Sequence, residues 1–381
     1  MEIEALRGQI DSIDRELVEL FKQRMQVSAD IAKYKKDNNL PVLDRTRERE
    51  LLNKIATLSG KELENYTSRL YAQILELSKS YQTKCLGEKS ELYEKIKKAF
   101  DEKDKMQFPE NAIVACQGVE GAYSSLACDK LFRSSSIMFT DSFDKVFSAV
   151  SQGLCQYGVL PIENSTAGSV NRVYDLMKKN NFYIVKCVRL KVNHSLLANK
   201  GAKLEGIKEI YSHDMAIAQS SDFLSKLDGV KVIPCENTAV AAKKVADSGR
   251  LDIAAISSKD CAELYGLDTL CESVQDRADN YTRFICISKK LEIYPGADKT
   301  SLMLTLSHKP GSLYSLLSMF SALDINILKL ESRPLESRDF EFMFYFDVEA
   351  SVYSDKFLQM ITELPSATES FTYLGSYSES I

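Results

Sequence analysis

The chain has 381 residues, a formal net charge of −5 and 44% hydrophobic residues. Its length exceeds one ordinary core and suggests roughly two or three domains. The acidic balance, without a long basic tract, argues against nucleic acid as the main partner, and no stretch approaches the roughly 20 apolar residues that cross a bilayer.

The cysteines and the N-terminus bear on the compartment. Nine cysteines are scattered without CxxC or Cys/His ligand spacing, a pattern that fits reduced thiols in a cytoplasm. The chain begins Met1-Glu-Ile-Glu, with acids where a signal peptide carries bases. We therefore expect a soluble cytoplasmic protein that uses no metal and no cofactor.

Residues 1–84 are predicted to be helical throughout. A stripe at helical spacing predicts a first helix of about 35 residues, and it is made of Leu6, Ile10, Ile13, Leu17, Leu20, Val27 and Ile31. Pro41 breaks this helix, a second follows from about Arg45 to Leu58, and a third from about Leu63 to Tyr81. Three helices with apolar seams predict an all-α bundle.

Some cations of this bundle lie where apolar residues belong. Arg24 falls on the stripe, and Lys35 follows three turns later on the same face, so roughly 16 Å separates their Cα atoms and a small anion fits between them. Arg7 lies about 25 Å from Arg24 along the axis and roughly 100° round the helix. It can serve such a pocket only from another copy of the chain, which predicts a dimer.

Polar residues on the other two helices complete this set. Arg47 and Glu48 follow Asp44, while Ser78 and Gln82 stand four residues apart on one helix face. Taken singly, each fits an ordinary solvated charge or an i,i+4 pair. As a set they predict a pocket for a small dianion that carries hydroxyl groups.

Over residues 1–84 these residues, with Arg45 and Thr46, resemble the helical class of chorismate mutases. The resemblance implies an intertwined helical dimer in which Arg24 and the partner chain's Arg7 bind two substrate carboxylates. It implies that Lys35 and Gln82 bond the ether oxygen and that Glu48 and the Asp44 region hold the ring hydroxyl. It also implies that Arg47 helps to order the site and that Ser78 binds substrate. Met25 stands where a second arginine is common in the family.

A charged segment, residues 85–109, is predicted to connect this bundle to an α/β region at 110–290. Short β-rich runs there alternate with helical ones, which predicts an α/β domain with two lobes. The predicted strands are Ala112–Cys116, Gly158–Ile162, Tyr183–Val188, Glu209–Ser212, Val230–Pro234, Ile253–Ser257 and Arg283–Ser288.

The strand at Gly158–Ile162 is followed at once by Glu163, Asn164 and Ser165. Ligands of open α/β sheets bind at the carboxyl ends of strands, so these side chains are site candidates. The alternative is that Asn164 or Ser165 caps a helix over Val170–Lys178.

Four further motifs stand in the same region: a GxxG turn from Gly118 that precedes Ser124, the segments around His194 and His213, and Thr282-Arg-Phe. Either histidine is as well explained by a structural hydrogen bond, and Arg283 is either a carboxylate clamp or a surface residue. In their order the motifs closely resemble prephenate dehydratase. The resemblance implies two lobes similar to periplasmic-type binding proteins, a catalytic Thr282, and Arg283, Phe284, Ser124, Asn164 and Ser165 at the substrate. We further hypothesise that a protonated Glu163 is the proton source.

Residues 298–378 read strand, helix, strand, strand, helix, strand, the ferredoxin-like order. Two segments resemble the amino-acid-sensing ACT module. In that module the corresponding segments flank bound phenylalanine at a subunit interface. The first segment contains His308, Gly311, Ser312 and Leu313, and the second contains Glu331, Ser332, Arg333 and Pro334. The alternative is a plain dimerisation module, and Ser312 and Tyr314 depart from the commoner motif.

The sequence thus predicts a multidomain, bifunctional enzyme of phenylalanine synthesis that acts on chorismate and prephenate, is inhibited by phenylalanine and forms a homodimer or tetramer. A non-catalytic metabolite sensor would predict losses at Arg24, Lys35 or Thr282, and all three are present. A dehydratase that prefers arogenate would keep every motif.

Overall fold

The computed structural model describes residues 3–38, 40, 44–86, 90–103, 106–334 and 342–380. The chain forms two compact units, each assembled from separate stretches of sequence. The first contains Met1–Lys98 and Thr300–Tyr373, and the second contains Ala99–Lys299 and Leu374–Ile381. We expected residues 298–378 to form one C-terminal domain, but residues 374–378 belong to the second unit.

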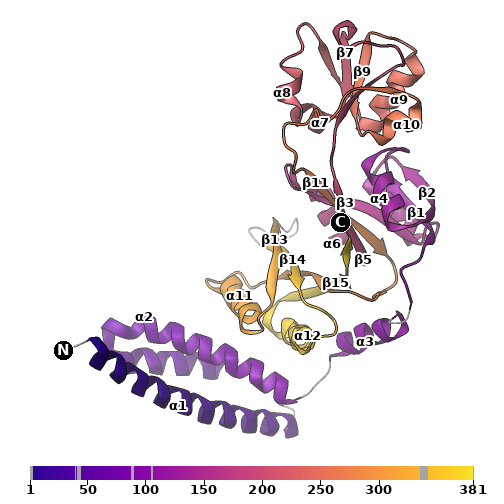
Figure 1. Ribbon diagram of the computed structural model, residues 1–381. Helices are drawn as coiled ribbons and strands as arrows, with labels where there is room; N and C mark the ends of the chain where they lie inside the picture. Colours follow the sequence, from indigo (N-terminus) through magenta and orange to yellow (C-terminus); the bar gives the residue numbers. More distant parts are fainter. Residues whose placement is uncertain are drawn as a thin grey trace. The chain divides into compact units, whose positions relative to one another are not determined.

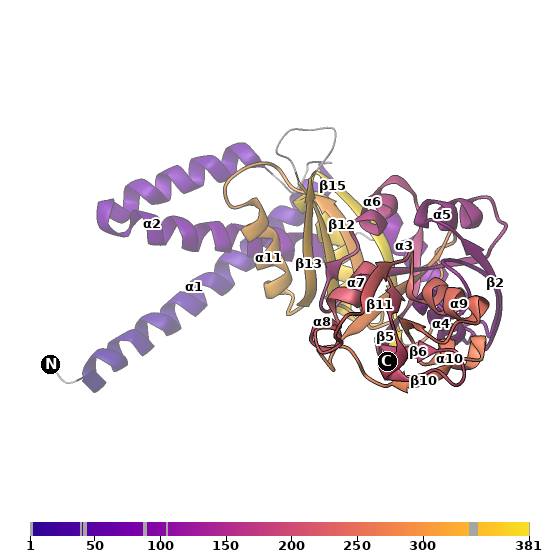
Figure 2. The same cartoon turned by 90° about the horizontal axis from the view of Figure 1, so that it is seen from above.

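The first unit begins with the predicted long helices. Helix α1 is Ile3–Asp37 and lies alongside α2, Arg45–Leu86 (Figure 1). Gly60 has φ 69° and ψ 161°, a non-helical conformation that glycine tolerates. Figure 2 shows α2 as two helical arms. The second and third predicted helices thus exist, and they meet at this glycine without a separate loop.

The apolar stripe of α1 remains largely uncovered in the single chain. The buried residues of α1 are Ser28, Ala29 and Ala32, near its C-terminal end. Along the rest of the helix Ile10 is 56% exposed and Leu20 is 60% exposed. An apolar stripe of this length gains stability when another surface covers it.

The other part of the first unit has the predicted strand and helix order. A four-stranded sheet runs β13-β14-β12-β15, with helices α11 and α12 in the connections. Buried side chains such as Leu302, Phe320 and Phe346 form its interior. The elements are β12 Lys299–Thr305, α11 Ser312–Ala322, β13 Asn326–Pro334, β14 Phe342–Glu349, α12 Asp355–Ala367 and β15 Ser370–Tyr377.

A buried polar cluster joins α2 to α12 inside this unit. Ser80 Oγ donates to Glu363 Oε1 at 2.7 Å, and Gln359 Nε2 donates at 2.8 Å to both of those oxygens. Burial raises the pKa of Glu363 above its ordinary value, although these hydrogen bonds oppose the shift.

The second unit has two sheets, which correspond to the two predicted lobes. The first sheet has the order β16-β5-β11-β3-β1-β2, with β4 beside β3, and the second has the order β10-β6-β9-β7-β8. The first sheet comprises β1 Asn111–Gln117, β2 Ser134–Thr140, β3 Tyr157–Asn164, β4 Gly168–Ser169, β5 Tyr183–Lys191, β11 Tyr281–Ser288 and β16 Glu379–Ser380. The second comprises β6 Ser195–Ala198, β7 Glu209–Ser212, β8 Lys231–Pro234, β9 Ile253–Ser257 and β10 Asp268–Cys271.

Helices connect and cover these strands. Helices α4, α5 and α6 pack on the first sheet, while α9 packs on β9 in the second (Figure 1). The helices of this region are α3 Glu91–Lys103, α4 Tyr123–Leu131, α5 Phe143–Ser151, α6 Asn171–Lys179, α7 Asp214–Ala218, α8 Ser221–Leu224, α9 Thr238–Ser248 and α10 Asp260–Tyr265.

The pairing of β3 with β11 positions the predicted site residues. These strands run antiparallel, with Thr282 opposite Asn164 and Arg283 opposite Glu163. The register shifts between Arg283 and Phe284, and Phe284 pairs with Pro161 at this bulge. A bulge is a place where a strand accepts a proline, which explains why β3 continues through Pro161 to Asn164.

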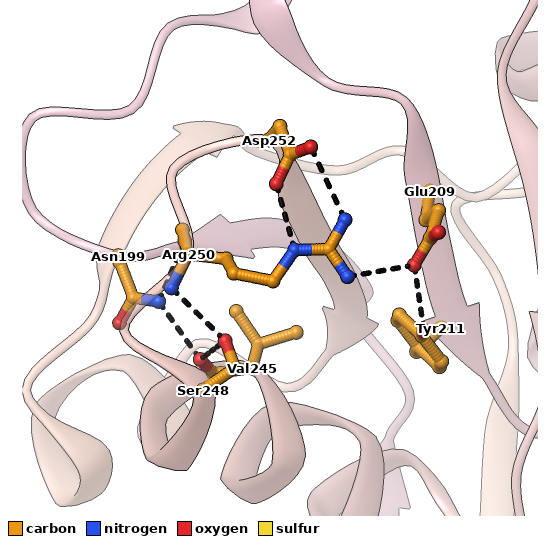
Figure 3. Close-up of polar contacts among 7 residues, drawn as sticks. All are labelled: Asn199, Glu209, Tyr211, Val245, Ser248, Arg250 and Asp252. Carbon is orange, nitrogen blue, oxygen red and sulfur yellow. Dashed lines mark hydrogen bonds and ion pairs between the residues drawn. The ribbon is translucent and has the colours of Figure 1, made fainter.

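An arginine cluster in the second lobe fastens the end of α9 to two strands (Figure 3). Arg250 donates to Asp252 at 2.9 and 3.1 Å and to Glu209 at 3.4 Å. Tyr211 donates to the same glutamate at 2.7 Å. Because Glu209 and Tyr211 lie in β7 and Asp252 immediately precedes β9, this cluster fixes the turn that follows Gly249, the left-handed residue that ends α9.

Candidate active sites

In the helical region, Arg24 and Ser78 come together as the sequence predicted. The Arg24 guanidinium donates to Ser78 Oγ, and the Ser78 side chain is 4% exposed. Ser78 Oγ also lies 3.7 Å from Met25 Sδ, so the residue that departs from the family pattern packs against a predicted site residue. A half-buried cation therefore faces the α1–α2 seam.

Gln82 lies one turn beyond Ser78 and is also buried. Within the described part of the chain, its side-chain oxygen has no hydrogen-bond partner. A buried amide without its partners is costly unless a ligand or water supplies them. Lys35 is half-buried on α1, and the half-buried Glu48 forms an ion pair with Lys79 at 3.2 Å.

Asp44, Arg47 and Arg7 lie at the margin of this cluster or beyond it. Asp44 Oδ1 accepts from the backbone N–H of Arg47 at 3.0 Å, while the Arg47 side chain forms an exposed ion pair with Glu50. Arg7 is exposed on the same uninterrupted helix as Arg24. The helix therefore holds Arg7 about 25 Å from Arg24 within one chain.

In the second unit, the ends of β3 and β11 form a network of amides around Thr282. Asn164 Nδ2 donates to Thr282 Oγ1 at 2.9 Å and to Asn280 Oδ1 at 2.8 Å. Asn164 Oδ1 accepts from the backbone of Thr166 and Ala167, so the turn after β3 fixes the orientation of the amide. Asn164 thus lies in a strand and a turn, and the alternative role as a helix cap is wrong, because the N-cap of α6 is Val170.

The network continues into the second lobe. Asn280 Nδ2 donates to Gln219 Oε1 at 3.0 Å, and His194 Nε2 lies 3.2 Å from the same oxygen. Burial lowers the pKa of His194, while the Gln219 bond opposes the shift, so the neutral imidazole is favoured. Among the described groups, its Nδ1 atom has no partner.

Three more residues hold His194 in place: Asn193 and Tyr123, which lie in the motifs around His194 and after the GxxG turn, and Gln275. Gln275 accepts from the His194 backbone N–H at 2.9 Å and donates to Asn193 Oδ1 at 2.8 Å. The Tyr123 hydroxyl donates to the Asn193 carbonyl at 2.9 Å. Asn280 had a sequence signal, since it stands two residues before Thr282, whereas Gln219 and Gln275 occur in no motif.

A cavity of about 430 Å³ lies against this network. Gln219, Gln275 and Asn280 line it, and so does Arg277. Thr166 and Asp276 also line it, and the Asp276 carboxylate accepts hydrogen bonds from Ser221 and Asp222. The amide groups and the Arg277 guanidinium supply donors that suit a carboxylate-bearing ligand.

Two predicted site residues lie on the other face of the first sheet. Directly paired residues share a face, and neighbours along a strand alternate. Asn164 and Thr282 therefore share one face, while Glu163 and Arg283 share the opposite one. This pairing does not support the hypothesis that Glu163 supplies a proton beside Thr282, which stays a prediction.

Arg283 and Phe284 also differ from the prediction. Arg283 is buried; it donates to the Tyr377 hydroxyl at 2.9 Å and forms an ion pair with Glu379, also at 2.9 Å. Phe284 is 2% exposed and packs in the core of the first lobe. The Arg283 side chain is thus engaged by the C-terminal segment, and the Phe284 side chain is part of the core, so a substrate contact of either residue stays a prediction.

The remaining predicted residues of this unit have structural partners or remain predictions. Ser165 Oγ donates to the Asp279 carbonyl at 3.2 Å and accepts from the Tyr281 N–H at 2.9 Å, which ties the turn to β11. Ser124 is buried in the first turn of α4. His213 caps α7, since its Nδ1 accepts from the Met215 N–H.

The two predicted effector motifs lie on different elements of the first unit. Gly311, with φ 88°, precedes α11, and Ser312 Oγ lies 3.0 Å from Ser307 Oγ. This loop and one face of α2 line a cavity of about 660 Å³, and within the described residues the lining does not include His308, Leu313 or the motif in β13. Glu331, Ser332, Arg333 and Pro334 form the last part of β13.

Comparison with known proteins assigns both catalytic regions. The family model of type II chorismate mutase matches residues 6–83, and that of prephenate dehydratase matches residues 114–292. Over 383 residues the chain is 31% identical to the bifunctional chorismate mutase/prephenate dehydratase of Escherichia coli (strain K12), covering 98% of this chain and 95% of that protein. The chain belongs to the bifunctional chorismate mutase/prephenate dehydratase family.

Other relatives match about 70% of the chain. Arogenate dehydratase/prephenate dehydratase 2, chloroplastic, of Arabidopsis thaliana is 38% identical over 276 residues, which is 69% of this chain and 72% of that protein. The structure of a prephenate dehydratase from Arthrobacter aurescens in complex with L-Phe covers 70% of this chain and 89% of that chain, at 25% identity and a TM-score of 0.64.

Within this bifunctional family member, the residues of Thr282-Arg-Phe fall inside the dehydratase match, and Arg24, Ser78 and Gln82 fall inside the mutase match. Of the described helices, none has the length and apolar character needed to span a membrane.

Proposed function

We propose that this chain converts chorismate into prephenate in its helical region and prephenate into phenylpyruvate, carbon dioxide and water in its second unit. The observation that carries the dehydratase half is the Asn164–Thr282–Asn280 cluster beside a cavity that contains Arg277. The mutase half rests on Arg24, Ser78 and Gln82 on one seam. The dispersed cysteines, which lack CxxC or Cys/His ligand spacing, support a cytoplasmic location.

A mutase of this kind needs neither a nucleophile nor an acid–base pair. The rearrangement is unimolecular, so the protein must hold one conformer and stabilise the charge that develops at the breaking C–O bond. Arg24 supplies a fixed cation, and the buried Gln82 amide supplies an oriented donor. Lys35, on the same helix as Arg24, is proposed to bond the ether oxygen together with Gln82.

The exposed apolar stripe of α1 supports an intertwined homodimer that brings in the partner's Arg7. Mixing two inactive variants tests this arrangement. After joint unfolding and refolding, Arg7→Ala and Arg24→Ala chains should regain about a quarter of wild-type mutase activity, because half of the dimers are mixed and each has one intact site. Each variant refolded alone is the control, and mixtures as inactive as the controls would contradict the shared site.

The dehydratase geometry supports Thr282 as the donor to the departing hydroxyl. Because Asn164 Nδ2 donates to Thr282 Oγ1, the threonine hydrogen is directed to another acceptor. Such a donor stabilises negative charge on the leaving oxygen while the ring carboxylate departs as CO2, and the departing hydroxide becomes water by taking up one proton from solvent. Formation of an aromatic ring favours the product strongly, so modest assistance suffices.

Arg277 is proposed to bind a substrate carboxylate, in place of Arg283. Arg277→Ala should raise the dehydratase KM for prephenate about tenfold or more and change kcat little, because the lost contact forms equally in the ground and transition states. Steady-state kinetics of the full chain measure this effect. Arg172→Ala, which removes an exposed ion pair with Asp144, is the control. An unchanged KM would exclude Arg277 from the site.

The effector role of residues 298–378 is also a proposal. The βαββαβ connectivity, the Gly311 loop and the motif at the end of β13 support an ACT module that binds phenylalanine at a subunit interface. Inhibition follows if phenylalanine binds one arrangement of the oligomer more tightly than another.

One assay tests the proposed function as a whole. Purified protein supplied with chorismate should produce prephenate and then phenylpyruvate, and added phenylalanine should suppress the second product. Arogenate in place of prephenate gives the specificity of the dehydratase directly. Folded protein that leaves both chorismate and prephenate unchanged would end the proposal.

A further inference from the structure

The last described residues of the chain form part of the dehydratase sheet. Strand β16 pairs parallel with β5, with Glu379 opposite Cys187, and the Cys187 N–H donates to the Ser378 carbonyl at 3.1 Å. Lys186 Nζ donates to Ser378 Oγ at 2.7 Å. A side chain at Gly375 would place its Cβ 2.2 Å from the Ile184 carbonyl oxygen, so this segment lies directly against β5.

Glu379 is the acidic centre of a buried charge cluster. Its side chain is 4% exposed and lies 2.9 Å from Arg283, 2.6 Å from Lys299 and 3.2 Å from Arg189. Burial raises the pKa of Glu379, but the three cations outweigh burial and the net pKa is below the ordinary value. The glutamate is therefore ionised at neutral pH, and it compensates cations that burial would otherwise penalise.

Arg283 links this cluster to the proposed catalytic threonine. It follows Thr282 directly in β11, and its side chain projects from the opposite face of that strand. The Arg283 guanidinium is held by Glu379 and by the hydroxyl of Tyr377, which is fully buried. The register of β11 also shifts immediately after Arg283. A strand end beside a bulge has fewer ladder bonds to fix it, so a side-chain anchor there determines where its neighbour points.

We propose that Glu379 is a positioning residue of the dehydratase, which fixes β11 through Arg283 so that Thr282 keeps its place beside Asn164. This inference rests on the proposed dehydratase function. It gives the C-terminal segment a role in catalysis although Glu379 lies on the sheet face opposite Thr282. It also gives Arg283 of the Thr-Arg-Phe motif a role other than substrate binding.

The first test is the kinetics of Glu379→Gln in the full chain, a substitution that keeps the shape and removes the charge. Dehydratase kcat should fall about tenfold, since small misplacements of a catalytic group cost up to about 10²-fold. The KM for prephenate should change less than about threefold, because Glu379 touches no substrate. Mutase activity should not change. Ser380→Ala, at the next position of β16, is the matched control.

A double-mutant comparison separates positioning from general stability. If Glu379 acts through Arg283, the Arg283→Gln, Glu379→Gln double variant should be no slower than Arg283→Gln alone. If the two substitutions acted independently by destabilising the fold, their fold-losses of turnover would multiply in the double variant. Their effects on the rate of thermal inactivation would then also combine in the double variant. Multiplying effects, or Glu379→Gln turnover within about twofold of wild type, would overturn the proposal.

Hydrogen exchange supplies a measurement that does not depend on turnover. Glu379→Gln should speed exchange of the amides of β11 at least about fivefold while those of β1 remain as in the wild type, because β11 loses the anchor of Arg283 and the described ion-pair partners of Glu379 lie in β5, β11 and β12. Unchanged exchange in β11 would refute the positioning role even if the wild-type chain proved inactive toward prephenate. If the wild-type chain is inactive toward prephenate but Glu379→Gln still speeds exchange in β11, the proposed function is rejected and the anchoring role of Glu379 stands.

Discussion

Thr282→Ala is expected to lower dehydratase turnover by about 10²- to 10³-fold, the usual cost of removing a donor that stabilises a developing negative charge. The Thr282 hydroxyl accepts from Asn164, so its own hydrogen is oriented before substrate arrives. Formation of phenylpyruvate from prephenate measures the loss. Chorismate mutase activity of the same preparation should equal that of the wild type, since the two sites lie in separate units.

Thr282→Ser is the matched variant for this prediction. It keeps the hydroxyl and removes only a methyl group, so Thr282→Ser should retain at least about a tenth of wild-type dehydratase turnover. If Thr282→Ala kept more than about a tenth of wild-type turnover, the catalytic role of Thr282 would have to be abandoned.

Arg24→Ala is expected to lower mutase kcat/KM by about 10²- to 10³-fold, because it removes a fixed cation from a half-buried seam. Arg24→Lys should recover only part of the loss, since lysine keeps the charge and not the planar fork. Arg15→Ala is the control, because that exposed arginine of α1 contacts only the Asp11 carbonyl among the hydrogen bonds described. Equal mutase activity in the Arg24 and Arg15 variants would remove Arg24 from the site.

The sequence was sufficient for the elements whose signal is local. The apolar stripe predicted the length of α1, and the β-rich runs located β7 and β9 at the residues where the structure has them. Strand β2 was missed because its serine-rich first half carries no β signal. Strand β6 is four residues long, and pairing with β9 and β10, rather than propensity, makes it a strand.

The sequence also identified the Asn164–Thr282 pair, through two motifs more than a hundred residues apart. It failed on the neighbours of that pair for one physical reason. Motifs group consecutive residues, whereas a strand sends consecutive side chains to opposite faces. Glu163 and Arg283 therefore belonged to the right motifs and lie on the other face of the sheet. Gln219 occurs in no motif and joins the network only through tertiary contact with His194 and Asn280, which no single-sequence pattern encodes.

The two-residue strand β16 has a consequence for biosynthesis. The dehydratase sheet takes its other strands from residues 111–288, but its edge is closed by residues that a ribosome adds only after the whole of Thr300–Tyr373. At about 5–20 residues per second, the 90 residues between Ser288 and Glu379 delay completion by roughly 4.5 to 18 s. During this interval a nascent chain exposes Arg283 and the open side of β5 to other polypeptides, so chaperones that shield unpaired strands should matter more for this half of the enzyme than for the helical half.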